Sequence, residues 1–279
     1  IVVTAQRRAE LSRDVPISLI VLSGNELKRA NVEQLSDISK LTPGVRFQGA
    51  TNFVQPSIRG VSTSLIGSGV GSNVGIYVDG FYSSTAAGSN FTLLNLKNLQ
   101  VLKGPQGTLF GRNTTGGAIL ITTARPSVET SAIVEASYER FNAKRVQGYV
   151  TTGLTSNLAI DVEGQFREGD GYFRDIVSNN RKVGTYEDWS VRSGMSWEPT
   201  DDVSVLLRYQ HSENRDPTYV QNNALVRNGS PLALAAIIPG ATIATRPGDV
   251  APSPNQPSYF SSNANTVQFT VQADLGFAN

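Results

Sequence analysis

The 279-residue sequence contains no cysteine and one histidine, His211. The lack of cysteine excludes a disulfide scaffold and a thiolate metal site. A histidine-based zinc site or a Ser-His-Asp triad would depend on His211 alone, so neither is expected. No other set of residues suggests a nucleophile, a base and an oxyanion donor close together. We therefore predict that the protein is not an enzyme and holds no metal or other cofactor.

The sequence also has little net charge and no long apolar run. Lys and Arg number 24 against 23 for Asp and Glu, which gives no basic excess and predicts no nucleic-acid partner. No stretch approaches the roughly 18 consecutive apolar residues of a transmembrane helix. A helical membrane protein is therefore excluded. A membrane β-barrel is not, because its strands carry apolar residues at every second position.

The amino-terminal region mixes short helical and strand-like patterns with many glycines. Ser23 and Glu26 have the spacing of a capping box at the start of a helix. Asn31 is predicted to cap a second short helix, with Leu35 and Ile38 on its inner face. Strand-like pieces follow at Ile58, Val74–Val78, Leu99–Lys103 and Ala118–Thr122. These patterns predict a small α+β domain that ends near residue 126.

From about residue 131 the pattern changes to repeated alternation of apolar and polar residues. In the segment 158–167, for example, apolar side chains such as Val162 and Phe166 oppose charged ones such as Glu163 and Arg167. Such alternation predicts strands with one apolar face. Six strands are predicted, at 133–138, 146–154, 158–167, 190–197, 203–209 and 267–277.

Two kinds of sheet fit this alternation: a soluble β-sandwich and a transmembrane barrel. The connections favour the barrel, because tight turns at Thr155–Asn157 and Pro199–Asp201 alternate with long joins at about 170–187 and 214–264. Short turns at one end and long loops at the other are typical of outer-membrane barrels. Six strands cannot close such a barrel, which has about eight at least. We therefore expect the sequence to be part of a longer protein.

A series of motifs lies in order along the first region. Its members are Ile1–Ala5, Asp14–Ser18, Leu41–Val45, Ile58–Gly60, Tyr77–Gly80, Val101–Gly111, Thr115–Ile119 and Arg125–Pro126. The series resembles the plug domain of TonB-dependent outer-membrane receptors over residues 1–126, and the run from Lys103 to Ile119 is its most specific part. The later strands resemble that family's barrel by pattern, and the family builds plugged barrels of about 22 strands.

The resemblance implies a fold and a domain order. Residues 1–5 would be a TonB box, 6–126 an α+β plug domain, and 127–279 the antiparallel first part of a transmembrane β-barrel in the bacterial outer membrane. The implied partners are TonB of the inner-membrane energising complex, outer-membrane lipid and a small-molecule substrate. The implied function is energised uptake of a scarce solute. A ferric siderophore is the commonest cargo in the family, and cobalamin, haem or an oligosaccharide are the alternatives.

Three groups of site residues follow from the resemblance. Ile1, Val2, Val3, Thr4 and Ala5 would add as a strand to TonB; the alternative is an ordinary first strand of the plug. Arg59 and Arg125 would lock the plug to glutamates of the barrel, since guanidinium pairs well with carboxylate; the alternative is two solvated or locally paired arginines. The substrate-facing loop residues would be Phe53, Tyr82, Asn90 and Phe91, which are equally consistent with plain loop.

Two further interpretations were weighed against this one. The glycines of the run 104–117 suggest a phosphate-binding loop, but the Gly-Lys-Ser/Thr that such a loop requires is absent from the sequence. A β-rich surface binding protein without an energised partner would explain the alternation and the lack of catalytic residues. It would not explain the ordered plug motifs.

Overall fold

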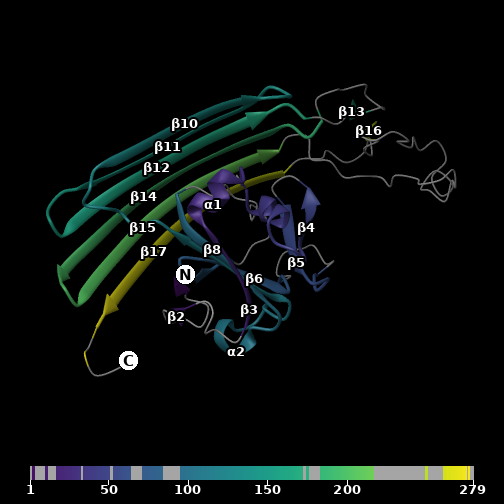
Figure 1. Ribbon diagram of the computed structural model, residues 1–279. Helices are drawn as coiled ribbons and strands as arrows, with labels where there is room; N and C mark the ends of the chain where they lie inside the picture. Colours follow the sequence, from purple (N-terminus) through teal and green to yellow (C-terminus); the bar gives the residue numbers. More distant parts are fainter. Residues whose placement is uncertain are drawn as a thin grey trace. The chain divides into compact units, whose positions relative to one another are not determined.

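The computed structural model describes residues 2–3, 10–11, 17–32, 34–50, 53–63, 71–83, 95–171, 174–175, 183–216, 249–250, 260–274 and 276. The chain divides into two compact units, Ile1–Ala124 and Arg125–Asn279, and each contains its own main sheet (Figure 1). No helix in the described part of the chain is both long and apolar enough to cross a membrane.

The first unit is built on a five-stranded mixed sheet in the order β3-β8-β9-β6-β7. β6 and β9 are parallel and the other neighbours are antiparallel. Two smaller two-stranded pairs, β1–β2 and β4–β5, complete the strands described here. The strands are β1 (Val2–Val3), β2 (Glu10–Leu11), β3 (Ser18–Ser23), β4 (Val45–Ala50), β5 (Phe53–Ile58), β6 (Val74–Val78), β7 (Phe81–Tyr82), β8 (Leu96–Lys103) and β9 (Gly117–Thr123).

The core of this unit lies on both faces of the sheet. On one face Leu99 and Ile119 pack against Leu35 and Ile38 of the short 3-10 helix, and all four are fully buried. On the other face a smaller cluster contains Leu102, Ala118, Leu120 and Tyr77. β9 therefore carries a continuous apolar run, Ala118–Ile121, because both faces exclude water, whereas β8 keeps the buried Gln100 among its apolar residues. The predicted strands at 74–78, 99–103 and 118–122 are confirmed, as is the α+β class.

The helices confirm one capping prediction and correct another. α1 (Gly24–Arg29) has the predicted capping box, in which Ser23 N–H donates to the Glu26 carboxylate at 2.8 Å. The 3-10 helix spans Leu35–Lys40, but Gln34 begins it and its N–H donates to Asp37 at 3.0 Å. Asn31, the predicted cap, instead closes α1 at φ 51°, a left-handed conformation that asparagine tolerates. A third, short helix is α2 (Gly107–Phe110).

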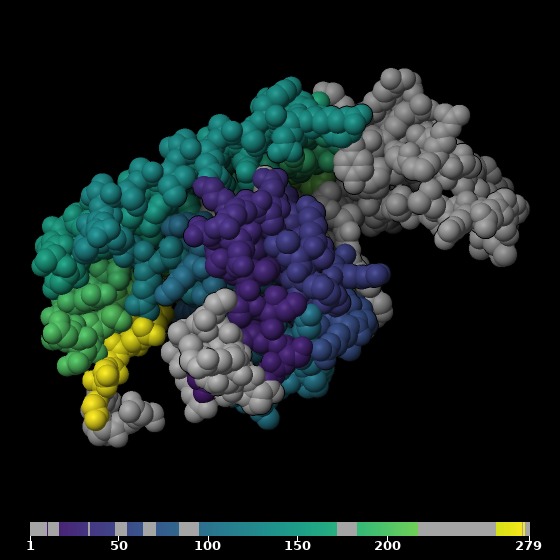
Figure 2. Space-filling model, viewed as in Figure 1, coloured from purple at the N-terminus to yellow at the C-terminus, as the bar shows by residue number. Residues whose placement is uncertain are grey.

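The second unit is an antiparallel sheet of six strands in the order β10-β11-β12-β14-β15-β17, which confirms the six predicted strands. Figure 2 shows the strands from β10, in teal, to β15, in green, packed side by side. Two short strands pair in parallel outside this sheet: β13, in the connection from β12 to β14, and β16, in the connection from β15 to β17. The strands are β10 (Ser131–Glu139), β11 (Ala143–Gly153), β12 (Leu158–Gly169), β13 (Arg174–Asp175), β14 (Tyr186–Thr200), β15 (Val203–Asp216), β16 (Asp249–Val250) and β17 (Phe260–Ala273).

The two predicted tight turns have different outcomes. The turn at Thr155–Asn157 lies between β11 and β12, where Leu154 N–H donates to the Leu158 carbonyl at 2.8 Å. The turn predicted at Pro199–Asp201 is misplaced, because β14 continues to Thr200 and the connection is Asp201–Asp202. A register shift between Trp197 and Thr200 accommodates the proline, whose missing N–H is tolerated at such an irregularity.

The register separates this sheet into an apolar face and a polar face. Val150 lies opposite Val162, Met195 opposite Leu207, and Leu207 opposite Phe269. All six strands contribute exposed apolar side chains to the apolar face: Val134, Tyr138, Val146, Val150, Val162, Phe166, Val191, Trp197, Leu207, Tyr209, Val267 and Phe269. Charged residues such as Glu163, Arg192 and Arg208 occupy the opposite positions along the same strands. This placement is the one expected if the predicted barrel strands turn their apolar side chains outward and their charged side chains inward.

Candidate functional site

The predicted TonB-binding segment begins the described chain as a short strand. Val2 pairs with Leu11 and Val3 with Glu10, both antiparallel. Ile1, Thr4 and Ala5 lie outside the described residues. A strand of two residues held by one short partner has few ladder bonds, so a longer strand could displace it. Val2 and Val3 therefore have the extended conformation that strand addition requires.

Arg59 sits in the turn that follows β5. Its backbone has φ 52°, and its N–H donates to the Gly44 carbonyl at 2.8 Å. The guanidinium is largely exposed, and Nη2 donates to the Ser18 hydroxyl at 3.0 Å. Within the first unit, then, Arg59 connects its turn to the start of β3.

Arg125 opens the second unit and bonds to two strands of the six-stranded sheet. Its Nη2 donates to Gln272 Oε1 at 2.7 Å, and its Nη1 contacts the Ser204 hydroxyl at 3.4 Å. These partners are neutral, whereas the resemblance implies carboxylates. The two predicted lock arginines belong to different units and have separate hydrogen-bond partners.

Tyr82 belongs to an aromatic group at the edge strand β7. Its ring lies 5.5 Å from that of Tyr77, which in turn lies 5.1 Å from Phe110. The Tyr82 hydroxyl accepts a hydrogen bond from Asn113 Nδ2 at 2.9 Å, and 36% of the residue remains exposed. Tyr82 is therefore a held, accessible aromatic group of the kind that ligands contact.

The other predicted loop residues fall outside what the structure describes. Phe53 begins β5, but its side chain is not among the described ones, and Asn90 and Phe91 lie in the undescribed stretch 84–94. Asn113, the partner of Tyr82, was missed from the sequence. An asparagine within the glycine-rich run 104–117 is the sequence signal that could have indicated a turn, and its backbone there is left-handed at φ 69°.

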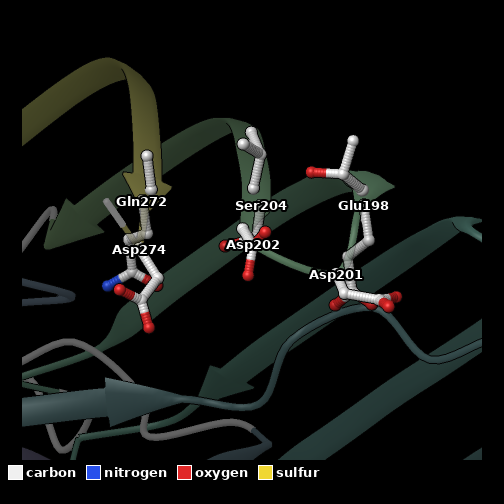
Figure 3. A pocket seen from close by; sticks show the side chains of 9 residues that line it. Glu198, Asp201, Asp202, Ser204, Gln272 and Asp274 are labelled. Atoms are coloured by element: carbon white, nitrogen blue, oxygen red, sulfur yellow. The ribbon is translucent and has the colours of Figure 1, made fainter. Parts of the chain in front are cut away.

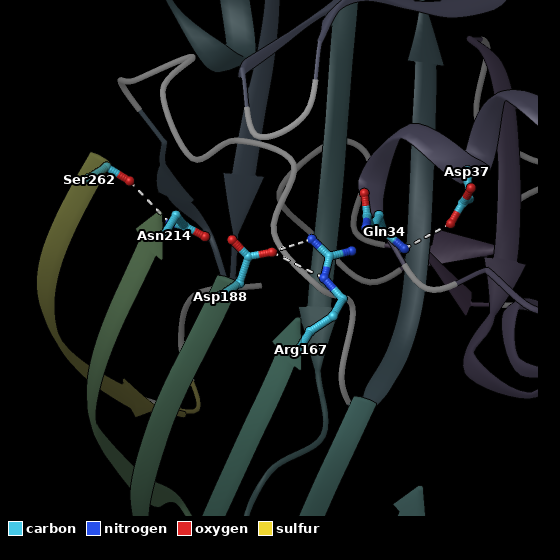
Figure 4. A network of polar contacts seen from close by, with 6 residues as sticks. All are labelled: Gln34, Asp37, Arg167, Asp188, Asn214 and Ser262. Atoms are coloured by element: carbon cyan, nitrogen blue, oxygen red, sulfur yellow. Dashed lines mark hydrogen bonds and ion pairs between the residues drawn. The ribbon is translucent and has the colours of Figure 1, made fainter. Parts of the chain in front are cut away.

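The polar face of the second sheet carries two buried ion pairs between β12 and β14. Arg167 donates to Asp188 through both Nε, at 3.1 Å, and Nη2 (Figure 4). Arg192 pairs with Glu163 at 2.5 Å, and all four side chains are no more than 11% exposed. Each pair joins residues directly opposite in the ladder. On the predicted charged face, these arginines and carboxylates are thus paired with each other across neighbouring strands.

An open pocket of about 480 Å³ lies where β14 and β17 end and β15 begins. Figure 3 shows the polar side chains that line it, among them Glu198, Asp201, Asp202 and Asp274. These four residues are exposed to water. Across the described residues, no group of three His, Cys, Asp or Glu could hold a metal ion. The pocket is therefore an acidic strand-end surface.

The single histidine is held in a polar cluster on β14, β15 and β17. His211 Nδ1 lies 2.8 Å from Asn265 Oδ1, and its ring lies 4.8 Å from that of Trp189. Trp189 Nε1 in turn donates to Glu213 at 3.1 Å. A tryptophan with a hydrogen-bonded N–H beside an apolar band is typical of a membrane–water boundary.

Comparison with known proteins links both units to one family. Residues 12–118 match the model of the TonB-dependent Receptor Plug Domain. The chain is 29% identical over 161 residues to the pesticin receptor of Yersinia pestis, a match that covers 55% of this chain and 24% of that receptor. It is also 29% identical over 179 residues to the vitamin B12 transporter BtuB of Vibrio vulnificus, covering 62% of this chain and 28% of that transporter.

The fold comparison extends through the six-stranded sheet. The crystal structure of the ferric yersiniabactin uptake receptor FyuA from Yersinia pestis superposes with a TM-score of 0.76 at 19% identity, over 92% of this chain and 38% of that one. The chain thus spans about a quarter of the curated relatives named above. Those relatives are receptors or transporters by name. Residues 12–118 thus form a TonB-dependent receptor plug domain, and the six-stranded sheet that follows has the fold of part of such a receptor's β-barrel.

Proposed function

We propose that the whole protein imports a scarce solute, a ferric siderophore, across the bacterial outer membrane in a TonB-dependent manner. The observation that carries the proposal is the plug-family match followed directly by a sheet with an apolar outer face. The names of the relatives support the cargo: FyuA is a ferric yersiniabactin uptake receptor. The apolar band supports a position of this sheet in the outer membrane, in contact with lipid.

In this proposal, residues 1–5 form the TonB box. TonB would pair with the strand that β1 begins and pull on it, and the proton-motive force across the inner membrane would supply the energy. The extended Val2–Val3 strand supports this role, because a strand of TonB could pair with β1 in place of β2. The plug, residues 6–126, would then rearrange within the barrel that begins at residue 127.

Arg59 and Arg125 are proposed to hold the plug at rest. Both present guanidinium groups with surface-accessible ends, and Arg125 already contacts two strands of the sheet. Tyr82 is proposed to contact the substrate, together with Phe53, Asn90 and Phe91. Its support is the exposed ring held by Asn113.

The test of the transport step uses Val3→Pro in the full-length receptor. Proline removes the N–H and prevents strand addition. We expect uptake of radiolabelled iron from a ferric siderophore to fall to the level of cells lacking the receptor. Val3→Thr, which keeps the N–H and the β-branched side chain, should transport normally. Undiminished uptake by Val3→Pro would overturn the proposed mechanism.

The cargo is tested separately by supplying labelled ferric siderophore, cobalamin or haem to the same cells. Iron-siderophore uptake that depends on the receptor supports the proposal. Receptor-dependent uptake of cobalamin alone would leave the transport mechanism intact and replace the substrate. Tyr82→Ala removes the exposed ring that is proposed to contact the substrate, and we expect it to raise the KM for uptake about tenfold, a loss of about 1.4 kcal/mol of binding free energy.

A further inference from the structure

The first residues of the second unit cross the polar face of its own sheet. We call the segment Arg125–Val128 the strap. It begins on β17 and β15, where Arg125 bonds to Gln272 at 2.7 Å and contacts Ser204 at 3.4 Å. The positively charged end of the strap is therefore attached to two neighbouring strands.

The next residue of the strap lies over a glycine of β14. A Cβ added to Gly194 would come within 3.3 Å of Pro126 Cγ and within 2.5 Å of Asp161 Oδ1. Any larger side chain at position 194 would have to displace the buried Asp161 carboxylate or the proline ring. The absent side chain at Gly194 thus leaves the space in which Pro126 lies.

The strap ends on β11. Ser127 N–H donates to the Thr151 hydroxyl at 2.8 Å, and that hydroxyl lies 3.1 Å from the Ser127 carbonyl oxygen. Gly153 N–H donates to the Val128 carbonyl at 3.1 Å, and a Cβ at Gly153 would lie 2.8 Å from that oxygen. Four consecutive residues therefore contact strands from β17 to β11, and two of the contacts require glycine.

On the other side of the junction the chain is tied equally firmly within the first unit. Thr123 N–H and hydroxyl donate to the two Asp79 carboxylate oxygens at 2.8 and 2.7 Å. Ala124 N–H donates to the Asn95 carbonyl at 2.9 Å. The anchors of the two units are thus separated by the single peptide bond between Ala124 and Arg125.

We propose that the strap, which includes Arg125 and Pro126 of the predicted plug range, stays fastened to the sheet while the plug rearranges. The moving part of the receptor is then residues 6–124 and not all of 6–126, and Arg125 holds the end of the plug without being released. A pull on the amino terminus would then be resisted at the strap, and any rearrangement would have to break plug contacts such as Thr123 with Asp79. The inference rests on the proposed function only in assuming that the plug rearranges during uptake. The attachment of the strap can be measured without transport.

The experiment introduces Pro126→Cys and Gly194→Cys together in the full-length receptor in outer membranes. The sequence described here has no cysteine of its own. We expect a mild oxidant to form the disulfide in most molecules, and uptake by the oxidised receptor to stay within twofold of the reduced one. Pro126→Cys with Gly164→Cys is the control, because position 164 belongs to the apolar face and should not cross-link.

Two results would overturn the inference: failure of the 126–194 pair to cross-link, or a cross-linked receptor that loses uptake and regains it on reduction. Because Gly194→Cys introduces a side chain into a tight space, a second measurement avoids it. Amide exchange at Ser127 should quicken at least tenfold in Thr151→Val and stay unchanged in Thr152→Val, whose hydroxyl faces the other way; equal exchange in both would also overturn the strap. Cross-linking with no uptake in either redox state would instead count against the proposed substrate or function.

Discussion

The two units use β-sheet in opposite ways. In the plug, β8 and β9 bury apolar side chains on both faces, and Leu99 and Ile119 are fully enclosed. In the six-stranded sheet, the apolar side chains are exposed on one face while charged ones such as Arg208 are buried on the other. The same strand geometry therefore suits different surroundings, according to which faces receive the apolar residues.

The largest expected effect breaks the buried charge pairing of the second sheet. Arg167→Met leaves Asp188 buried without its cation, and we expect a loss of about 3–5 kcal/mol in unfolding free energy. The measurement is urea unfolding of the full-length receptor in detergent micelles. Lys144→Met is the matched control: it breaks the exposed pair with Glu168 and should cost no more than about 1 kcal/mol. Equal losses of unfolding free energy in Arg167→Met and Lys144→Met would contradict the expected difference between the buried and the exposed ion pair.

The next effect compares leucines of the two units. Leu99→Ala opens a cavity in the plug core and should cost about 2–5 kcal/mol. Leu207→Ala, on the apolar face and 39% exposed, should cost less than about 1.5 kcal/mol. Hydrogen exchange of amides in β9 and β15 reads the two units separately. A Leu207→Ala loss as large as that of Leu99→Ala would show that this face packs against protein.

A charge on the apolar face tests lipid exposure directly. Leu207→Arg should destabilise the receptor in bilayers by about 2–4 kcal/mol. Ser212→Arg, on the polar face of the same strand and opposite Ser190 and Ala264, should change stability by about 0.5 kcal/mol or less. Folding titrations in lipid vesicles provide the measurement. If Leu207→Arg is as harmless as Ser212→Arg, the face is not in contact with lipid.

The smallest effect concerns the plug surface and depends on pH. Hydrogen bonds from the Ser23 backbone and then its hydroxyl lower the pKa of Glu26 below the usual glutamate value. A lowered pKa in the folded state means that this stabilisation is present above the unfolded-state pKa and is lost as pH falls through the folded one. Glu26→Ala should therefore lower the melting temperature at pH 7 but not at pH 2. Ser23→Ala should lower the melting temperature at both pH values, because it also removes the hydroxyl that accepts the hydrogen bond of the Glu26 N–H. A loss in Glu26→Ala that persists at pH 2 contradicts the explanation.

Local patterns in the sequence predicted much of the fold. Alternation predicted six strands, and Ser23 with Glu26 predicted the start of α1, because each depends on residues a few positions apart. The ends were less accurate, since Pro199 was read as a turn residue when a register shift keeps it in β14. The short strands β3 and β4 were not predicted, because their few residues carry weak alternation.

The contacts of the site were less predictable than the elements. Arg125 was singled out by resemblance, but its partners Gln272 and Ser204 are 147 and 79 positions away. Nothing local distinguishes Gly194, which receives Pro126, from Gly164, which lies beside no such residue. Such pairs depend on the register of strands far apart in sequence, and no spacing rule supplies that register.

The ion pairs between β12 and β14 also bear on how the sheet assembles. A slip of one residue would turn the apolar side chains to the wrong face and is excluded by hydrophobicity. A slip of two residues keeps every face correct, so hydrophobicity does not oppose it. It would, however, place Arg167 opposite Tyr186 or Ser190 and Asp188 opposite Gln165 or Gly169, leaving buried charges without counter-ions. The ion pair thus disfavours sheets with a two-residue slip, which the alternation of apolar residues alone would allow.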